Sequence, residues 1–309
     1  MRKKKRQESE IEHVVQNGLN YYVVAFLDIL GQRDLLRRMD EIELTNPFPD
    51  DLTSLLPKTL GLVTTIRRSF RQFTEELPLT INISMLSKEQ QREYFELRAT
   101  NVKTQLLGDS FIYYIPLSDP MPRPITSIYI TLAACATFLP LAIATGFPIR
   151  GAIDIGWASE LRDGEIYGPA LMRVFDLESQ AAKYPRVLIG ERLMQYLSLH
   201  SRDTDSTDLR EQAKIHMSAL CQALVTCDFD GRTILNYLGD HARDTFADTP
   251  VNRQRIVGEV LPKAYRFITK ELDRFRQLND EKLTPRYEQL KAYFDISLPI
   301  WGIEPDDIV

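Results

Sequence analysis

The sequence predicts an α+β fold in which helices cover one face of a largely antiparallel sheet, and three patterns support this. A strand of β-branched and aromatic residues ends abruptly at an acidic residue. Two later apolar runs are separated by a Gly-Asp dipeptide, which is typical of a β-hairpin. A long apolar helix follows the hairpin and precedes another strand. With 309 residues, the chain is expected to form one elaborated domain, or one domain plus an appendage, and is long enough for a sizeable core.

The first predicted strand covers residues 21–27 and ends at Asp28. A helix is expected over residues 32–40, so the strand delivers an acidic side chain to a strand-to-helix turn. An insertion of about residues 45–100 follows. Its apolar residues from 55 to 70 have near-helical spacing, and a shorter helix is expected over residues 84–95.

The hairpin is expected from residues 102–107 and 110–115, with Asp109 in its turn. The apolar helix that follows covers residues 125–145 and contains Thr, Ser, Tyr and Pro residues. It lacks the uninterrupted ~20 apolar residues of a membrane span, so we expect a buried core helix and no stable membrane insertion.

A strand is expected at 149–157, then a loop through 163–165, a helix over 169–183 and a strand at 187–189. The resulting order, β-α-insert-β-β-α-β-α-β, is that of an extended ferredoxin-like arrangement.

The remainder contains two strand-like segments, residues 224–229 and 233–238, and an amphipathic helix over 256–278 that must pack on the domain or on a partner chain. The expected organisation is therefore a basic flexible tail (1–19), a main domain (20–240) and a helical C-terminal extension (241–309).

The composition excludes some classes of function. The formal net charge of −5 argues against a general nucleic-acid binder, because such a protein needs a basic face. The basic run at residues 2–6 is interpreted as a solvated tail, and the alternative is a weak contact with a polyanion or a membrane surface. The three cysteines, Cys135, Cys221 and Cys227, have no Cys-x-x-Cys spacing and fit structural thiols in a reducing cytoplasm.

Asp28 and Asp109 are the strongest candidates for chemistry. If their strands pair side by side, the two carboxylates become neighbours that could hold two divalent metal ions, which would activate an attacking oxygen and neutralise phosphate charge. The simpler alternative is that Asp28 caps the following helix and Asp109 only makes the turn.

The ordered set of motifs resembles class III nucleotide cyclases over roughly residues 20–195, or as far as 240. The matching segments are Phe26-Leu27-Asp28-Ile29-Leu30-Gly31, Leu107-Gly108-Asp109-Ser110-Phe111, residues 149–156, Tyr167-Gly168 and Leu177-Glu178.

The resemblance implies that Asp28 and Asp109 bind two Mn²⁺ or Mg²⁺ ions, with the backbone carbonyl of Ile29 as a third contact. The implied reaction is attack of a ribose 3′-hydroxyl on the α-phosphorus, with pyrophosphate leaving. In the turn after the first acid, backbone N–H groups at a helix N-terminus would wrap the phosphates. In this chain they belong to Leu30, Gly31 and Gln32.

The positions that read the base depart from the family pattern. Gln105 stands where purine cyclases carry Lys or Glu, and its partner position is Glu165. An amide, which both donates and accepts, does not match the usual purine pairing. The positions that supply a transition-state Asn and Arg are Met172 and Asp176. The chain is therefore either inactive or obtains cations elsewhere, with Arg173, Arg150, Arg33 and Arg232 as candidates.

The chain most resembles the pyrimidine cyclases of Pycsar antiphage systems. The resemblance rests on residues 21–31, on residues 149–156, and on Asp228-Phe229-Asp230-Gly231 followed by Tyr237-Leu238. It implies a homodimer with active sites at the interface that makes cyclic UMP or cyclic CMP, usually with Mn²⁺, and so triggers an effector and cell death. A tyrosine could fill the space beside a small base, although core packing is the alternative. The candidates are Tyr22, Tyr113 and Tyr167.

Three hypotheses follow. The first is a cytoplasmic uridylate cyclase that converts UTP to cyclic UMP, with Asp28 and Asp109 as metal ligands and Arg173 as a catalytic cation. The second is a cyclase-like module that senses a nucleotide without turnover. The third is a cyclase for CTP or a purine nucleotide, or a polymerase-like reaction on the same type of fold.

Overall fold

A computed structural model describes residues 19–43, 49–61, 64–65, 68, 88, 102–117, 124–162, 164–201, 209–247 and 249–308. The expected basic tail, except for Leu19, and most of the expected insertion, including the helix at 84–95, lie outside the described residues.

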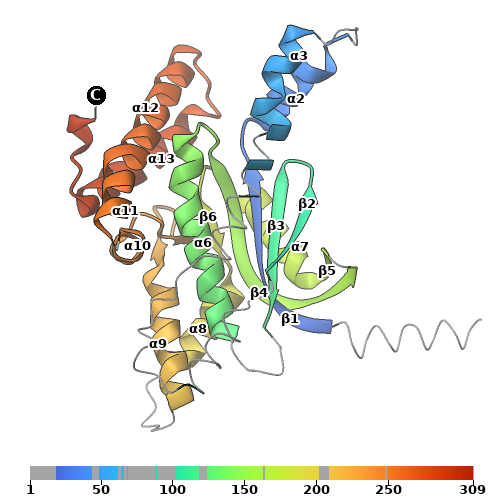
Figure 1. The fold of residues 1–309 in the computed structure, drawn as a ribbon, viewed down its shortest axis with the longest axis vertical. Helices are drawn as coiled ribbons and strands as arrows, with labels where there is room; N and C mark the ends of the chain where they lie inside the picture. The colour runs from blue at the N-terminus through green and yellow to red at the C-terminus, as the bar shows by residue number, and fades with distance from the viewer. Residues whose placement is uncertain are drawn as a thin grey trace, which may run out of the picture.

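The sheet is centred on β1 (Leu19–Ile29), which pairs antiparallel with β3 (Ser110–Pro116) on one side and β4 (Ile149–Arg162) on the other (Figure 1). The full order is β2-β3-β1-β4-β6-β8-β7, and β4 with β6 is a parallel pair. The other strands are β2 (Lys103–Leu107), β6 (Val187–Ile189), β7 (Val225–Cys227) and β8 (Thr233–Leu235). The predicted α+β class with a mostly antiparallel sheet is therefore confirmed.

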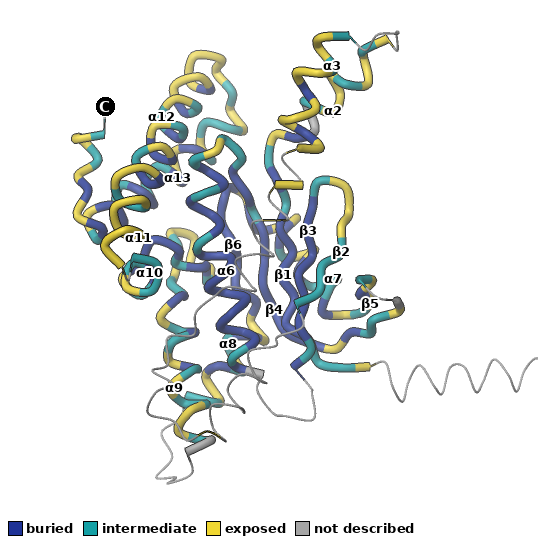
Figure 2. Tube along the Cα trace, viewed as in Figure 1, coloured by how far each residue is buried: buried dark blue, intermediate teal, exposed yellow. Residues whose placement is uncertain are grey.

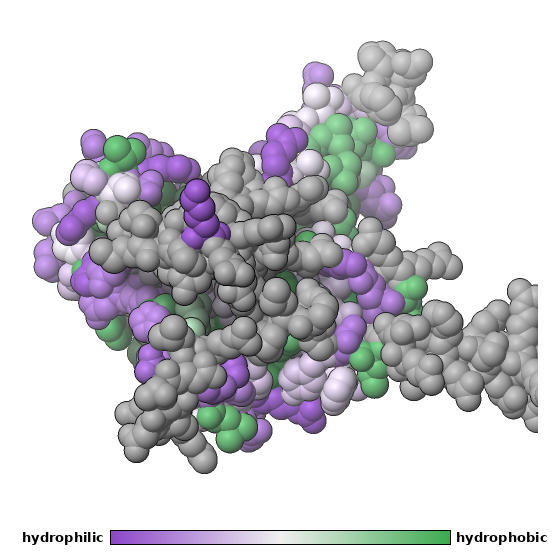
Figure 3. Space-filling model, turned by 60° about the horizontal axis from the view of Figure 1, so that its bottom comes forward, coloured by the Kyte–Doolittle hydropathy of each residue, from purple (hydrophilic) through white to green (hydrophobic). Residues whose placement is uncertain are grey.

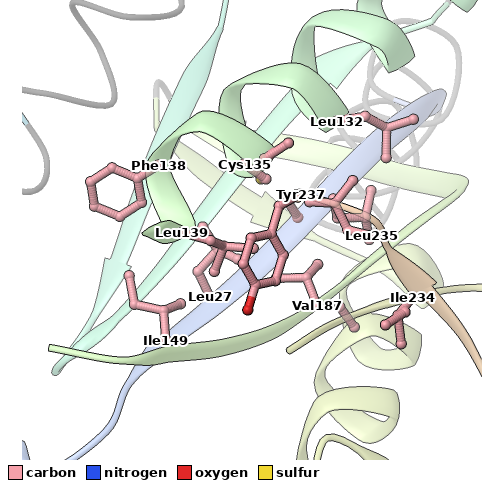
Figure 4. Packing of buried hydrophobic residues seen from close by; sticks show 14 of the residues in the cluster. Leu27, Leu132, Cys135, Phe138, Leu139, Ile149, Val187, Ile234, Leu235 and Tyr237 are labelled. Atoms are coloured by element: carbon pink, nitrogen blue, oxygen red, sulfur yellow. The ribbon is translucent and has the colours of Figure 1, made fainter. Parts of the chain in front are cut away.

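Helices pack on both faces of this sheet. Leu27 lies in the buried cluster under α6 (Pro124–Ala144), together with Leu139 (Figure 4). The neighbouring Phe26 instead packs edge-on against Phe175 of α7 (Pro169–Ala181), with ring centroids 5.5 Å apart. Because successive strand side chains point to opposite faces, α6 and α7 lie on opposite sides. The expectation that helices cover one face was wrong, and coverage of both faces explains why β1 is apolar without alternation.

Helix α6 is the core helix that the sequence predicts. It is long and apolar enough to cross a membrane by length and composition, but 83% of its apolar window is buried inside the protein. It packs against α9 (Leu209–Ala223) and α12 (Leu261–Gln277) as well as the sheet. Figure 2 shows it buried along most of its length.

The segment expected to be a loop at 163–165 belongs instead to a short hairpin. β4 continues to Arg162 and pairs with β5 (Glu165–Tyr167), with Gly164 in the turn at a φ of 79°. The Glu160 carboxylate stabilises this hairpin, because it accepts hydrogen bonds from Lys103 Nζ (2.6 Å), Tyr114 Oη (3.0 Å) and the Gly164 N–H (3.0 Å).

The remaining helices lie outside the sheet core. α2 (Gln32–Asp40), α3 (Asp50–Leu55) and the π-helical turn η1 (Pro57–Gly61) project from the end of β1 (Figure 1). α8 (Glu191–His200) follows β6, and α10 (Asp240–Phe246) follows β8.

The C-terminal extension is helical, as predicted. It comprises α11 (Pro250–Arg255), η3 (Ile256–Val260), α12, α13 (Thr284–Ser297), η4 (Leu298–Trp301) and η5 (Pro305–Asp307). α12 packs on α6 and α13, so the predicted amphipathic helix covers the domain. The surface of this region in Figure 3, at the left, is mainly hydrophilic.

Candidate functional site

The register of β1 and β3 brings the two predicted acids together. Asp28 is the direct partner of Ser110, and Ser110 Oγ donates a hydrogen bond of 2.9 Å to Asp28 Oδ1. Asp109 immediately precedes Ser110 in the β2–β3 turn, where Gly108 has a φ of 64°. The expectation that the two strands pair side by side is confirmed.

The environment of Asp28 favours a nearby cation. Burial raises the pKa of Asp28, the hydrogen bond from Ser110 lowers it, and the negative charge of Asp109 raises it again, with a net upward shift. The charge of Asp109 therefore disfavours the ionised form of Asp28. A divalent ion between them would relieve this repulsion, and carboxylate oxygens suit Mg²⁺ and Mn²⁺.

The donor set for such an ion is small. Among the described residues, no group of three or more Asp, Glu, His or Cys side chains is placed to hold a metal ion. A metal ion at this position could use the carboxylates of Asp28 and Asp109, together with the backbone carbonyl of Ile29, which follows Asp28 in β1. These oxygen donors fit the metal ions that the sequence resemblance implies.

Arg150 lies between Asp28 and a further acid, Glu178. It is the β4 partner of Asp28, and its Nη2 and Nε atoms lie 3.2 and 3.3 Å from Asp28 Oδ2. Its Nε atom also lies 2.5 Å from Oε1 of Glu178 on α7. The sequence reasoning named Arg150 as a candidate cation, and the structure places it at Asp28.

Glu178 is a site residue that the sequence reasoning did not assign, although it lies in the quoted Leu177-Glu178 motif. Its side chain is 3% exposed. Burial raises the pKa of Glu178 to about 7; Arg150 opposes this shift, while the charges of Asp28 and Asp109 add to it. The site therefore holds three acids and one closely paired arginine.

A second cation, Arg286, approaches from the C-terminal extension. Arg286 belongs to α13. Burial and the positive charge of Arg150 together lower its pKa. The packing explains the approach, because Phe267 of α12 contacts Gly146 just before β4 and also faces Tyr287, with ring centroids 6.5 Å apart. No sequence motif pointed to Arg286.

The turn after Asp28 offers fewer anion-binding N–H groups than expected. Gly31 adopts a left-handed conformation (φ 88°) before α2 begins at Gln32. The Leu30 N–H already donates to the Pro148 carbonyl at 3.0 Å. The N–H groups of Gly31 and Gln32 remain as candidates at the helix N-terminus. The Gln32 side chain is buried and donates to the Lys58 carbonyl at 3.2 Å. The side chain of Arg33 lies outside the described part of the structure.

The two positions expected to read the base lie on β2 and β5, which approach each other although they are not paired in the sheet. Gln105 on β2 is the partner of Ile112, and Ile112 is the partner of Phe26, so Gln105 shares the α7 face with Asp28. Its Oε1 atom accepts a hydrogen bond of 2.9 Å from the Ile166 N–H. Glu165, the preceding residue of β5, is exposed.

The three candidate tyrosines have different surroundings. Tyr22 is buried and packs edge-on against Tyr114, with ring centroids 5.8 Å apart. Tyr113 stacks on Phe111 on the α6 face, opposite Asp28, so the idea that it packs on a base beside Asp28 is contradicted. Tyr167 on β5 is 67% exposed.

Arg173 is not part of the cluster around Asp28. Its Nε lies 3.2 Å from Asp154 Oδ2, and its Nη2 donates to the Ile155 carbonyl at 2.6 Å, so it is held farther along β4. Met172 and Asp176, on the same helix, are exposed.

The Asp228-Phe229-Asp230-Gly231 motif forms the β7–β8 turn. Asp228 and Asp230 bind Arg186 there, and Arg232 Nε lies 3.4 Å from Asp230. In the strand order, β4 and β6 separate β8 from β1. The structure therefore does not bring Arg232 to Asp28.

No protein-family model and no curated protein matches the sequence. Similar solved structures include the adenylyl cyclase CyaB from P. aeruginosa, at 15% identity and a TM-score of 0.36, over 70% of this chain and 92% of that one. Another is the catalytic core of a rhodopsin-guanylyl cyclase with converted specificity in complex with ATPalphaS. It is 15% identical, with a TM-score of 0.35, over 58% of this chain and 82% of that one.

Proposed function

We propose that the protein is a metal-dependent nucleotide cyclase of the class III type that converts UTP to 3′,5′-cyclic UMP and pyrophosphate. The observation that supports this most is the β1–β3 register, which places Asp28 beside Ser110 and so brings Asp109 next to it. The charge of Asp109 disfavours the ionised form of Asp28 even with Arg150 beside it, and a nucleoside triphosphate arrives with divalent cations bound.

The residues around this pair have separate roles in the proposal. Asp28, Asp109 and the Ile29 carbonyl would hold two Mn²⁺ or Mg²⁺ ions, which when bound would activate the ribose 3′-hydroxyl and neutralise phosphate charge. The N–H groups of Gly31 and Gln32 would orient the phosphates.

Arg173 is the proposed catalytic cation. Since Asp154 holds it away from Asp28 within one chain, this role requires a homodimer in which Arg173 of one copy faces the Asp28 site of the other.

The base would bind on the β2–β5 side of the site. Gln105 Oε1 is already used by the Ile166 N–H, so the amide NH₂ is the group left to donate to a base carbonyl. A uracil presents two carbonyl acceptors, which favours UTP over ATP, because adenine has no carbonyl group. Glu165 and Tyr22 are the other proposed contacts.

The biological role is proposed from the sequence motifs. The resemblance to Pycsar cyclases supports a cytoplasmic homodimer that makes its messenger during phage infection. The messenger would activate an effector that causes abortive infection.

The proposal is tested by incubating the protein with each nucleoside triphosphate and Mn²⁺ and separating the products by chromatography. Cyclic UMP is expected from UTP, and Asp28→Ala and Asp109→Ala should abolish it. Asp40→Ala, which removes an exposed acid from α2, is the matched control and should remain active. The proposal fails if no nucleotide gives a cyclic product, or if Asp28→Ala forms as much product as the wild type.

A second candidate is a nucleotide-sensing module without turnover. The departures at Met172 and Asp176 favour it, because neither side chain can supply the amide or the guanidinium of an active cyclase. It predicts metal-dependent binding of UTP in equilibrium dialysis without release of pyrophosphate. The same product chromatography distinguishes UTP from CTP and from purine substrates.

A further inference from the structure

Arg150 lies between Asp28 and Glu178, and the proposed reaction assigns it no role. A guanidinium stays charged at every physiological pH and its donors have a fixed geometry. Arg150 directs both Nε and Nη2 toward one oxygen of Asp28, while Nε also contacts Glu178 at 2.5 Å. The single N–H on Nε donates to Asp28, and the buried Oε1 of Glu178 accepts no hydrogen bond from the described residues although Nε lies close to it, so the two acids compete for Arg150.

We propose that Arg150 is an internal counter-cation for Asp28, and that Glu178 regulates metal binding by retaining Arg150 when metal ions occupy the Asp28 and Asp109 carboxylates. This inference rests on the proposed function and concerns the regulation of the same site. In the absence of metal, Arg150 offsets the charge of Asp28. When metal binds, the contact of Arg150 with Asp28 weakens and its contact with Glu178 persists.

The direction of this exchange follows from the charges. A divalent ion on Asp28 would stand close to the Nη2 atom, which lies 3.2 Å from the same carboxylate, and the two positive charges repel each other. Glu178 offers the alternative anion. Among the described residues, Arg150 is the cation within ion-pair distance of Glu178.

The position of Glu178 suits this role. It lies on α7, a helix of 13 residues that packs on both β1 and β4, so its carboxylate is fixed relative to both strands. With 3% exposure, it has little access to solvent cations that could replace Arg150. Some residues do not bind a metal ion themselves but orient a group beside one of its ligands. Replacing such a residue typically changes the metal affinity by about 10–100-fold.

The test measures Mn²⁺ binding directly at pH 8, by the electron paramagnetic resonance signal of free Mn²⁺, without substrate. Glu178→Gln should weaken Mn²⁺ binding by about tenfold, because Arg150 then has Asp28 as its remaining charged partner. Arg150→Gln should bind Mn²⁺ at least as tightly as the wild type. Glu191→Gln, which removes an exposed acid from α8, is the matched control for net charge and should not change the affinity.

A double-mutant cycle separates this role from a simple loss of negative charge. If Glu178 acts through Arg150, Glu178→Gln should change the affinity by less than about twofold in the Arg150→Gln background. If Glu178 acts only as a nearby charge, the loss should be the same in both backgrounds, and that result would overturn the proposal.

Separate control experiments test whether each variant folds and whether it acts as proposed. Each variant is checked for cooperative thermal unfolding, and Glu178→Asp, which keeps the charge but has a shorter reach, should bind Mn²⁺ with intermediate affinity. Unchanged affinity in folded Glu178→Gln overturns this inference while leaving the cyclase proposal intact. A wild-type protein that neither binds Mn²⁺ nor forms a cyclic product overturns both.

Discussion

Ser110 on β3 donates a hydrogen bond of 2.9 Å to Asp28 on β1, and the two residues are direct partners across the antiparallel pair. This contact fixes the rotamer of Asp28 and lowers its pKa against the opposing effects of burial and Asp109. Because Asp109 is the next residue back along the chain, the same register determines how the two acids meet.

Ser110→Ala should reduce cyclic product formation by about tenfold while reducing the free energy of unfolding by about 1 kcal/mol, the usual net value of one such bond. The physical reason is that Asp28 loses a fixed orientation and its pKa rises further. Steady-state kinetics at several Mn²⁺ concentrations and urea denaturation measure the two effects. Ser54→Ala, which removes an exposed hydroxyl bonded to the Asp51 carbonyl, is the control. Unchanged activity in Ser110→Ala would contradict the role assigned to the contact.

Glu178 should make stability depend on pH. Its pKa rises from 4.5 to about 7 on folding, mainly because of burial, so the folded state retains a proton that the unfolded state loses. The contribution of Glu178 to the free energy of unfolding is therefore greatest below about pH 4.5 and falls as the pH rises to about 7. The groups that face Glu178 are Arg150, Asp28 and Asp109.

Relative to Glu178→Gln, the wild type should lose at most about 3 kcal/mol of unfolding free energy between pH 5 and pH 8, since solvent screening reduces the effect. Urea denaturation in metal-free buffer across this range measures the difference. The control Glu191→Gln should follow the wild-type profile. A difference between wild type and Glu178→Gln that does not change with pH would show that the carboxyl does not titrate in this window.

The sequence predicts the centre of the site because its signals are local. A continuous apolar run that ends in Asp28, and a Gly-Asp dipeptide between two apolar runs, each identify a strand end without knowledge of the rest of the fold. The length and flanking prolines of α6 identify a core helix in the same way. The face of Tyr113 could also have been predicted, because a residue three positions after Ser110 in a strand points to the opposite face.

Other parts of the site depend on packing between distant segments. Glu178 reaches Arg150 only because α7 packs across β1 and β4. Arg286 approaches only because α12 packs on α6 and α13 packs on α12. The β5 strand has three residues, too few for a periodic pattern. Its position is set by the Glu160 carboxylate, whose partners are separated from it by up to 57 residues.

Arg286→Gln should raise the KM for the nucleoside triphosphate by about tenfold with a smaller change in kcat. Arg286 is placed near Arg150 by the C-terminal helices, and two like charges in a partly buried place are stabilised when an anionic ligand binds between or beside them. Initial rates over a range of UTP concentrations separate the two constants. Arg276→Gln, which breaks an exposed pair with Glu288, is the matched control. Equal KM values for Arg286→Gln and the control would remove the C-terminal extension from the substrate site.

Glu160→Ala should weaken the discrimination between UTP and CTP. The Glu160 carboxylate accepts hydrogen bonds from Lys103, Tyr114 and Gly164, and despite its partial burial these contacts lower its pKa. Without it, the β4–β5 hairpin that carries Glu165 keeps the hydrogen bond between Ile166 and Gln105 but loses the contacts with Lys103 and Tyr114, so the distance between Glu165 and Gln105 varies more. The ratio of kcat/KM for the two nucleotides should fall by about tenfold, a difference of about 1.4 kcal/mol in transition-state binding. Glu211→Ala, which removes an exposed pair with Lys214, should leave the ratio unchanged. If Glu160→Ala reduces stability while the ratio stays at the wild-type value, the hairpin does not take part in reading the base.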